Sequence, residues 1–209
     1  MLLTGGTQAG TMISHRHKFI FLHIPKCAGS TLNKAFLDYS DDSEFDAWHP
    51  KFKQYCLKYK EALNYTKIIS TRNPWDRLVS AFYYLKKGGN QSSHDIKLSK
   101  TLNIYENNFA QWVQNDFRKV INLDLRVNHL KPISFYISKN HIDYSIKLEN
   151  IQQDFDSVCD KIGIPRKQLP ITNKTRHKHY TEYYDDETRA IVAEKYAKDI
   201  EYFGYEFGS

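Results

Sequence analysis

The first clear hydrophobic run of the chain lies at residues 19–24. It ends at Pro25, which is typical of a short buried strand followed by a turn. Apolar residues then recur at helical spacing, so we expect a helix that is capped by Ser30 or Thr31 and runs to about Tyr39.

The same order of strand, turn and helix recurs further along the chain. Residues 66–71 are a β-branched run that stops at the turn sequence RNPW, and a helical pattern extends from Trp75 to Leu85. Two such units favour parallel strands. We therefore predict an α/β fold: a single domain with a central parallel sheet and flanking helices.

The remaining patterns predict further elements and the limits of the domain. We expect residues 1–17 to be a flexible leader and residues 18–209 to form the domain. The other expected elements are a helical segment at 51–63, a mobile excursion at 88–103, a helix at 104–117, short strands at 134–137 and 144–148, a helix at 151–162 closed by Gly163, and a last helix capped by Asp185 or Asp186 and ending near Ile200.

The composition is that of an ordinary globular protein with a basic surface. The chain has 209 residues, of which 41% are hydrophobic and 26% charged, and a net charge of +6. This charge favours anionic partners such as nucleotides or sulfated sugars, although solubility alone also explains it. The three cysteines are too far apart for a disulfide framework or a metal finger, and no run is long enough for a transmembrane segment.

The stretch FLHIPKCAGST has features of an anion-binding turn. Small residues between a strand and a helix expose backbone N–H groups, and the helix N-terminus adds its dipole. Pro25 and Gly29 shape the turn, Lys26 supplies a charge, and Ser30 and Thr31 supply hydroxyls. A plain turn with an exposed lysine is the alternative. The lysine precedes the glycine, so this is not a Walker A loop, and a magnesium-dependent phosphoryl transferase is disfavoured.

The segment STRNPWDRLVSAFYYLK contains a second candidate phosphate site. Arg72 ends the strand and Ser80 lies eight residues later in the helix. If the helix begins near Pro74, Ser80 projects to the side where Arg72 emerges, and an arginine fork with a hydroxyl suits a phosphate monoester. The alternative is that Arg72 pairs with Asp76 and Ser80 only lies on the helix surface.

These two segments resemble motifs of sulfotransferases. HIPKCAGST resembles the family's 5′-phosphosulfate-binding loop, and RNPWDRLVSAFYY resembles its 3′-phosphate-binding segment. The resemblance is greatest to the carbohydrate O-sulfotransferase branch, which includes Golgi enzymes and small bacterial relatives. It covers roughly residues 18–207, because NHLKPISFYI, IKLENIQQDFDSVCDKIGI, LPITNKT and YAKDIEYFGYEF follow in the family's order.

The resemblance implies sulfuryl transfer from 3′-phosphoadenosine 5′-phosphosulfate (PAPS) to a hydroxyl, with no metal. Lys26 would then be catalytic, because it neutralises charge on the oxygen that leaves with the 5′-phosphate. It also implies a P-loop-like phosphosulfate-binding turn. The implied nucleotide contacts are Pro25, Lys26, Cys27, Ala28, Gly29, Ser30, Thr31, Arg72, Ser80, Arg176 and Lys178.

The acceptor hydroxyl needs a base, for which His49 is the first choice. It lies between the two motifs, at a position that resembles the base histidine of the 2-O-sulfotransferase branch. A structural histidine is the alternative, and Glu44 or Asp46 could serve instead. His23 lies on the strand, where we expect a buried histidine.

The expected partners are the nucleotide donor and a glycan or other hydroxyl acceptor, with no nucleic acid. Two alternatives stay open: a nucleotide-dependent phosphotransferase and a non-catalytic binding module for anionic polymers. The basic loop NKTRHKHY at residues 173–180, which contains Arg176 and Lys178, could also be an acceptor-binding patch or a solvated surface. We expect a cytoplasmic enzyme of the bacterial type, with the lumenal domain of a truncated Golgi protein as the alternative. The sequence does not specify the acceptor or the oligomeric state.

Overall fold

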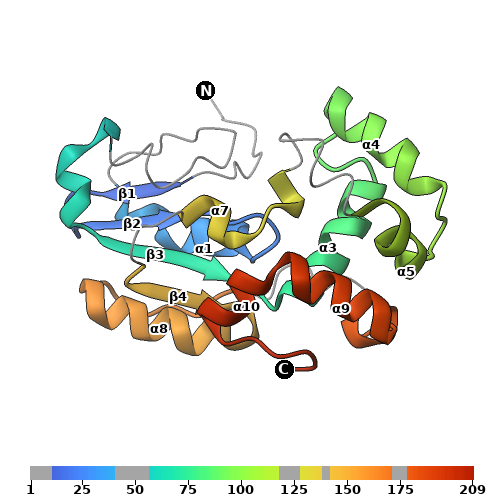
Figure 1. Ribbon diagram of the computed structural model, residues 1–209. Coiled ribbons are helices and arrows are strands. Elements are labelled where there is room, and N and C mark those ends of the chain that lie inside the picture. The colour runs from blue at the N-terminus through green and yellow to red at the C-terminus, as the bar shows by residue number, and fades with distance from the viewer. Residues whose placement is uncertain (1–10, 41–56, 118–127, 138–141, 171–177) are drawn as a thin grey trace. The chain divides into compact units, whose positions relative to one another are not determined.

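The computed structural model describes residues 11–40, 57–117, 128–137, 142–170 and 178–209 (Figure 1). Its elements are β1 (Met12–Ser14), β2 (Phe19–Leu22), α1 (Gly29–Phe36), η1 (Leu37–Tyr39), η2 (Lys60–Asn64), β3 (Thr66–Thr71), α3 (Pro74–Lys86), α4 (Ser93–Asn103), α5 (Phe109–Trp112), η3 (Val113–Phe117), η4 (Asn128–Leu130), α7 (Ile133–Ile137), β4 (Tyr144–Lys147), η5 (Leu148–Asn150), α8 (Ile151–Ile162), η6 (Tyr180–Tyr183), α9 (Asp186–Lys195) and α10 (Ala197–Phe203).

The described strands form one sheet in the order β1-β2-β3-β4, which Figure 1 shows edge to edge. β2, β3 and β4 run parallel, and β1 is antiparallel to β2. Leu22 pairs with Ile69 in the register of β2 and β3. Because these neighbouring strands are parallel, the segments that follow them leave the sheet at the same edge. The predicted α/β class, with a mostly parallel sheet and flanking helices, is confirmed.

Within this α/β domain the chain divides into two compact units. The first comprises Met1–Thr71 and Ile133–Lys174, and the second comprises Arg72–Pro132 and Thr175–Ser209. The boundary after Thr71 separates the last residue of β3 from the start of the predicted phosphate segment. Each unit therefore contains one of the two predicted motifs.

The core of the first unit lies where α1 and α8 pack on the sheet. Phe19 and Phe21 of β2 are fully buried and alternate with Ile20, so they lie on one face of the strand. Phe36 of α1 lies with its ring centroid 5.1 Å from that of Phe21 and 5.3 Å from that of Phe155 on α8. These aromatic contacts fix α1 directly behind the turn that follows β2.

The core of the second unit is a helical cluster around α3. Phe82 of α3 lies 5.0 Å from Trp112 and 5.4 Å from Phe109, centroid to centroid.

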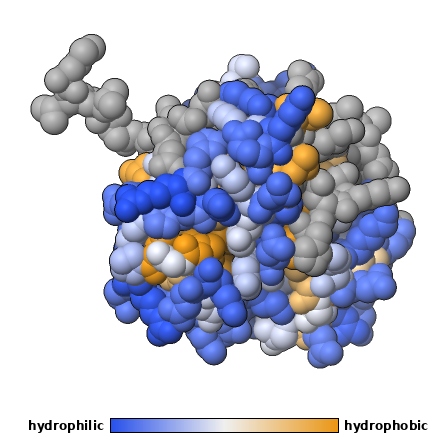
Figure 2. Space-filling view, turned by 90° about the vertical axis from the view of Figure 1, so that its left-hand side faces the viewer, coloured by the Kyte–Doolittle hydropathy of each residue, from blue (hydrophilic) through white to orange (hydrophobic). Residues whose placement is uncertain are grey.

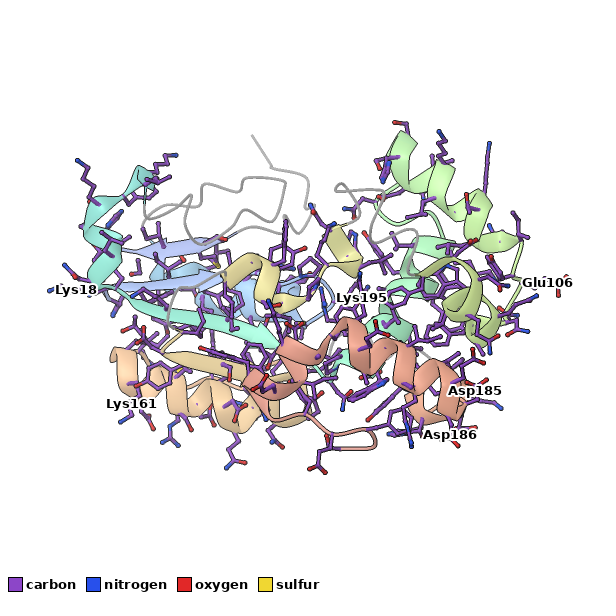
Figure 3. All side chains as sticks on the ribbon, viewed as in Figure 1. Lys18, Glu106, Lys161, Asp185, Asp186 and Lys195 are labelled. Carbon is purple, nitrogen blue, oxygen red and sulfur yellow. The ribbon has the colours of Figure 1, made fainter. Side chains whose placement is uncertain are left out.

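On α9, the aspartates Asp185 and Asp186 lie at the start and Lys195 at the end, as Figure 3 shows. Charges placed in this way complement the helix dipole.

Part of the predicted leader belongs to the sheet. Met12–Ser14 pairs with Phe19–Phe21 through a tight turn, and Met12 and Ser14 are fully buried. The leader assignment was therefore wrong for this stretch, because a strand of only three residues gives too short a hydrophobic pattern to recognise. The rest of the proposed domain division stays a prediction.

Four other predictions were wrong in detail. Residues 88–103 contain helix α4 instead of a mobile excursion, because the Ser92 hydroxyl accepts a hydrogen bond from the N–H of Asp95 and caps it. The segment 133–137 is helix α7, not a strand, and the helix expected at 104–117 begins only at Phe109. The predicted last helix is divided at Tyr196 into α9 and α10.

Other segments formed as predicted. The long helix expected from Trp75 to Leu85 is α3, the strand expected at 144–148 is β4, and α8 ends at Gly163 in the left-handed conformation. Of the helix expected at 51–63, residues 51–56 lie outside the described residues.

The surface is mainly polar on the face drawn in Figure 2, where hydrophilic side chains surround a small hydrophobic area. Among the described helices, none has the length and apolar character needed to cross a bilayer.

Asn73 holds together the start of α3 and the segment 206–209. Its side chain is fully buried, and its amide oxygen accepts a hydrogen bond from the N–H of Trp75, which caps the helix. Its amide nitrogen donates to the carbonyl oxygen of Glu206 at 2.8 Å and to the Tyr180 hydroxyl at 3.1 Å. One side chain thus satisfies polar groups from three segments of the second unit.

Replacing Asn73 should destabilise the protein more than an ordinary cap does. Asn73→Ala is expected to lower the free energy of unfolding by about 2 kcal/mol, since it removes a cap and leaves buried polar groups without a partner. Asn73→Asp should be at least as harmful, because an acceptor then faces the carbonyl oxygen of Glu206. Urea unfolding measures both changes.

The control is Asn108→Ala, which removes an exposed cap at α5. It should cost about 1 kcal/mol. Equal losses for Asn73→Ala and Asn108→Ala would contradict the special role of Asn73.

Candidate functional site

The turn after β2 has an unusual backbone at two residues. Lys26 has φ 67° and Ala28 has φ 58°, so both adopt the left-handed region that non-glycine residues rarely occupy. The N–H of Cys27 donates to the carbonyl oxygen of Ile24 at 3.3 Å, which closes the turn. Strained backbone of this kind often occurs at ligand sites.

Helix α1 begins earlier than the sequence predicted. We expected Ser30 or Thr31 to cap it, but the helix starts at Gly29, and Ala28 occupies the cap position. In this described segment no side-chain hydrogen bond caps the helix, because the left-handed Ala28 itself ends the turn. Ser30 and Thr31 therefore lie in the first turn of α1, and the N–H of Thr31 donates to the carbonyl oxygen of Ala28 at 3.0 Å.

Burial distinguishes the residues of this turn that can contact a ligand through their side chains. Lys26, Ala28 and Ser30 are partly exposed. The alternate positions Pro25, Cys27, Gly29 and Thr31 are buried. The buried residues shape the turn: the N–H groups of Cys27 and Thr31 donate to the carbonyl oxygens of Ile24 and Ala28.

Position 29 requires glycine because there is no room for a side chain. A Cβ atom at this position would lie 2.5 Å from atoms of the His23 imidazole, closer than real Cβ atoms approach. Its backbone is helical, so a left-handed conformation does not explain the glycine. His23 is buried, as expected, with 6% exposed. The imidazole therefore sets how closely α1 approaches the end of β2.

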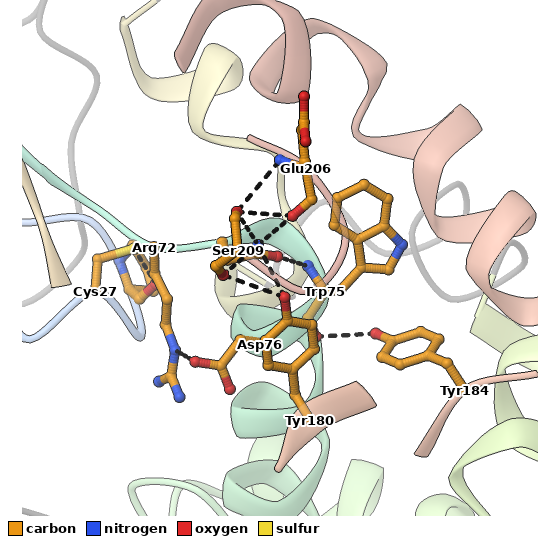
Figure 4. Close-up of polar contacts among 10 residues, drawn as sticks. Cys27, Arg72, Trp75, Asp76, Tyr180, Tyr184, Glu206 and Ser209 are labelled. Carbon is orange, nitrogen blue, oxygen red and sulfur yellow. Dashed lines mark hydrogen bonds and ion pairs between the residues drawn. The ribbon is translucent and has the colours of Figure 1, made fainter. Parts of the chain in front are cut away.

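The second candidate segment starts with a well-defined helix N-terminus. Pro74 occupies the first turn of α3, as the sequence predicted, and Asn73 caps the helix. The Nε–H of Arg72 donates to the Asp76 carboxylate at 2.7 Å, so the pairing that the sequence left as an alternative is present (Figure 4). Arg72 and Asp76 are both partly buried, with 12% and 20% of their side chains exposed.

Ser80 lies on the same face of α3 as Asp76. The two residues are four apart in one helix, which places their side chains one turn from each other. Because Arg72 contacts Asp76, its guanidinium lies toward this face as well. Ser80 is buried, with 7% of its surface exposed.

The remaining predicted site residues fall largely outside the described residues. This applies to His49, to the alternative bases Glu44 and Asp46, and to Arg176. Lys178 is described: its side chain is 73% exposed and its ammonium lies 3.5 Å from the Glu182 carboxylate. Its expected contact with the nucleotide stays a prediction.

Sequence reasoning missed two residues that shape these segments. It gave no role to Asn73, and it described His23 only as a buried strand residue. The one available signal for Asn73 was its position before Pro74, which is typical of a cap. Nothing in the sequence indicated that His23 packs against Gly29, because that contact depends on the turn between them.

Cys159 is a core residue, and the described part of the chain contains no cluster of potential metal ligands. Burial, followed by the charges of Asp156 and Asp160, raises the pKa of the Cys159 thiol to about 11, so it is a protonated core residue. Within the described ranges, no three His, Cys, Asp or Glu side chains gather closely enough to hold a metal ion.

Comparison with known proteins identifies the family. Residues 9–206 match the model of the sulfotransferase family, which covers most of the chain. The chain belongs to the sulfotransferase family. It is also similar to carbohydrate sulfotransferase 9 of Homo sapiens, with 23% identity over 217 residues, covering 90% of this chain and 47% of that protein. The chain thus spans about half the length of this relative, and no solved structure matches it significantly.

The contact between Gly29 and His23 can be tested by double substitution. Gly29→Ala should lower the free energy of unfolding by about 1–3 kcal/mol, because the added methyl group overlaps the imidazole. In a His23→Ala background the same change should cost at least about 1 kcal/mol less, since the ring is absent. Chemical unfolding of the wild type, the two single variants and the double variant measures the coupling free energy between the two residues.

Gly163→Ala is the matched control. Its Cβ would have no neighbour within 4 Å, and its cost of about 1 kcal/mol arises from φ +70°, so His23→Ala should not change it. Strictly additive losses for Gly29→Ala and His23→Ala would show that the two residues do not clash.

Proposed function

We propose that this protein transfers a sulfuryl group from PAPS to a hydroxyl of a carbohydrate. The observation that carries the proposal is the parallel pairing of β2 and β3. The segments that resemble the two phosphate-binding motifs follow these strands, and therefore start at the same edge of the sheet. Ligands of parallel α/β sheets bind at the carboxyl ends of the strands.

The turn after β2 is our candidate for the 5′-phosphosulfate. The N–H groups of Gly29 and Ser30, the first two residues of α1, would donate to the anion, and the first turn of the helix would add its dipole. Lys26 is partly exposed and could approach the oxygen between sulfur and phosphorus. As the S–O bond breaks, negative charge grows on that oxygen, and a nearby ammonium stabilises it.

The segment after β3 is our candidate for the 3′-phosphate. Arg72 would donate to the phosphate oxygens, and the Ser80 hydroxyl would donate from the same face of α3. The Arg72–Asp76 contact supports this assignment, because Asp76 and Ser80 are one helical turn apart.

The acceptor hydroxyl attacks sulfur in line with the leaving phosphate and must lose its proton. His49 is the proposed base that accepts this proton, with Glu44 and Asp46 as alternatives. An imidazole can accept a proton near neutral pH without further activation. The balanced reaction yields the sulfate ester, 3′-phosphoadenosine 5′-phosphate and a proton.

The most specific part of the proposal is that the acceptor is a carbohydrate. It rests on the name of the human relative, carbohydrate sulfotransferase 9, and on the basic charge of +6, which suits a sulfated or otherwise anionic glycan. The cytoplasmic location expected from the sequence stays a prediction.

The experiment is incubation with PAPS that carries labelled sulfate and a panel of glycans, followed by mass detection of products. A glycan that gains one sulfuryl group, without added metal, supports the proposal. Transfer of labelled phosphate from a nucleoside triphosphate to an acceptor, with no sulfated product, would instead indicate a phosphotransferase.

Lys26 should act on the transition state more than on the bound donor. Lys26→Ala is expected to lower turnover about a hundredfold or more, as when an oxyanion donor is lost, with a much smaller change in donor affinity. Initial rates at saturating donor measure this effect. Lys34→Ala, which removes an exposed lysine on helix α1 after the turn, should keep normal turnover. Normal turnover with only a raised donor KM in Lys26→Ala would make Lys26 a binding residue.

His49 should be needed for chemistry and not for nucleotide binding. His49→Ala is expected to lower turnover about a hundred- to ten-thousandfold, because the general base is lost. Binding of 3′-phosphoadenosine 5′-phosphate should stay within twofold in calorimetry. The wild-type rate should fall below about pH 6.5, where an ordinary imidazole takes up a proton.

The competing assignment is tested by Glu44→Gln and Asp46→Asn. Full activity in His49→Ala together with a large loss in one of these variants would transfer the role of base to that carboxylate.

A further inference from the structure

The contact between Arg72 and Asp76 has a geometry that restricts the arginine. The Nε–H of Arg72 donates to the Asp76 Oδ2 atom at 2.7 Å, and the pair is largely shielded from solvent. An arginine side chain has several rotatable bonds and a planar, forked head group. A hydrogen bond at Nε restrains the orientation of that head group. The two terminal nitrogens are carried on Cζ, beyond Nε.

The position of Asp76 is itself fixed by the start of α3. Asn73 caps the helix with a fully buried side chain, and Pro74 sets the backbone of the first turn. Asp76 lies in that first turn, where the helix dipole favours a carboxylate. The carboxylate is therefore a rigid reference point from which the arginine can be oriented.

Asp76 could affect the binding of an anion to Arg72 in two opposite ways. It can pre-organise the guanidinium, so that less side-chain entropy is lost when a phosphate binds. It can also compete with that phosphate, because a carboxylate near a bound anion repels it. Orientation favours the first effect: Asp76 engages Nε, and it lies one helical turn before Ser80, the other candidate phosphate ligand.

We propose that Asp76 is a positioning residue that orients Arg72 so that its terminal amino groups face a phosphate monoester beside Ser80. The inference rests on the proposed function, since the phosphate is the 3′-phosphate of the donor nucleotide. Asp76 does not contact the nucleotide. It acts through Arg72 and determines how well the site distinguishes a 3′-phosphorylated nucleotide from one with a free 3′-hydroxyl.

The experiment compares two ligands by calorimetry: 3′-phosphoadenosine 5′-phosphate and adenosine 5′-phosphosulfate, which lacks the 3′-phosphate. Asp76→Ala should weaken the first at least tenfold and the second less than twofold. Asp76→Asn should restore binding of the first to within threefold of wild type, because its amide oxygen can still accept the bond from Nε. A merely structural role would weaken both ligands equally.

Asp186→Ala is the matched control. Asp186 also lies in the first turn of a helix of the same unit and pairs with an arginine, Arg189, at 3.4 Å. This variant should bind both ligands as the wild type does. Thermal unfolding of each variant shows whether it is folded at the temperature of the titration.

The outcomes separate this inference from the function on which it rests. Arg72→Ala should weaken the 3′-phosphorylated ligand at least tenfold and the other far less. If it weakens both equally, or if the wild type binds neither ligand, the 3′-phosphate site is wrong and the role of Asp76 fails with it. If Arg72→Ala is selective but Asp76→Ala binds as tightly as wild type, only the positioning role is overturned. If Asp76→Ala binds more tightly, the positioning role is overturned and Asp76 competes with the phosphate.

Discussion

The parallel pairing of β2 with β3 is the constraint on which the rest of the site depends. Both strands are short: β2 consists of buried apolar residues, and β3 ends in the buried polar residues Ser70 and Thr71. A parallel pair needs a long crossover between its strands, and here α1 lies within that crossover. The pairing fixes one edge of the sheet as the place where two polar segments begin.

The two segments are built by different physical means. The first uses backbone: Lys26 and Ala28 are left-handed, and Gly29 lets helix α1 approach His23. The second uses side chains: Asn73 caps α3, and Asp76 holds Arg72. A turn that offers N–H groups suits a group that changes charge during reaction, whereas an oriented arginine suits a phosphate that only has to be recognised. The proposed division of work between the sulfuryl end and the 3′-phosphate end of the donor follows this difference.

The sequence predicted those parts in which several local signals agree. Helix α3 has a cap, a proline in its first turn and an apolar face, and β2 and β3 are β-branched or aromatic runs that end at turns. The segment 133–137 failed because a short buried apolar run does not distinguish a strand from a helix. Helix α4 was missed because its composition is typical of a loop, while its stability depends on the Ser92 cap. The left-handed Ala28 and the contact between His23 and Gly29 leave no pattern, since both arise from tertiary packing.

A crystal structure with bound 3′-phosphoadenosine 5′-phosphate tests the central claim most directly, namely that the segments after β2 and β3 bind the two ends of one nucleotide. The account predicts the 5′-phosphate on the backbone N–H groups at the start of α1 and the 3′-phosphate on Arg72 and Ser80, with Asp76 still on the arginine Nε. A nucleotide bound away from either segment, or a 3′-phosphate held by other residues while Arg72 stays remote from it, would contradict the account.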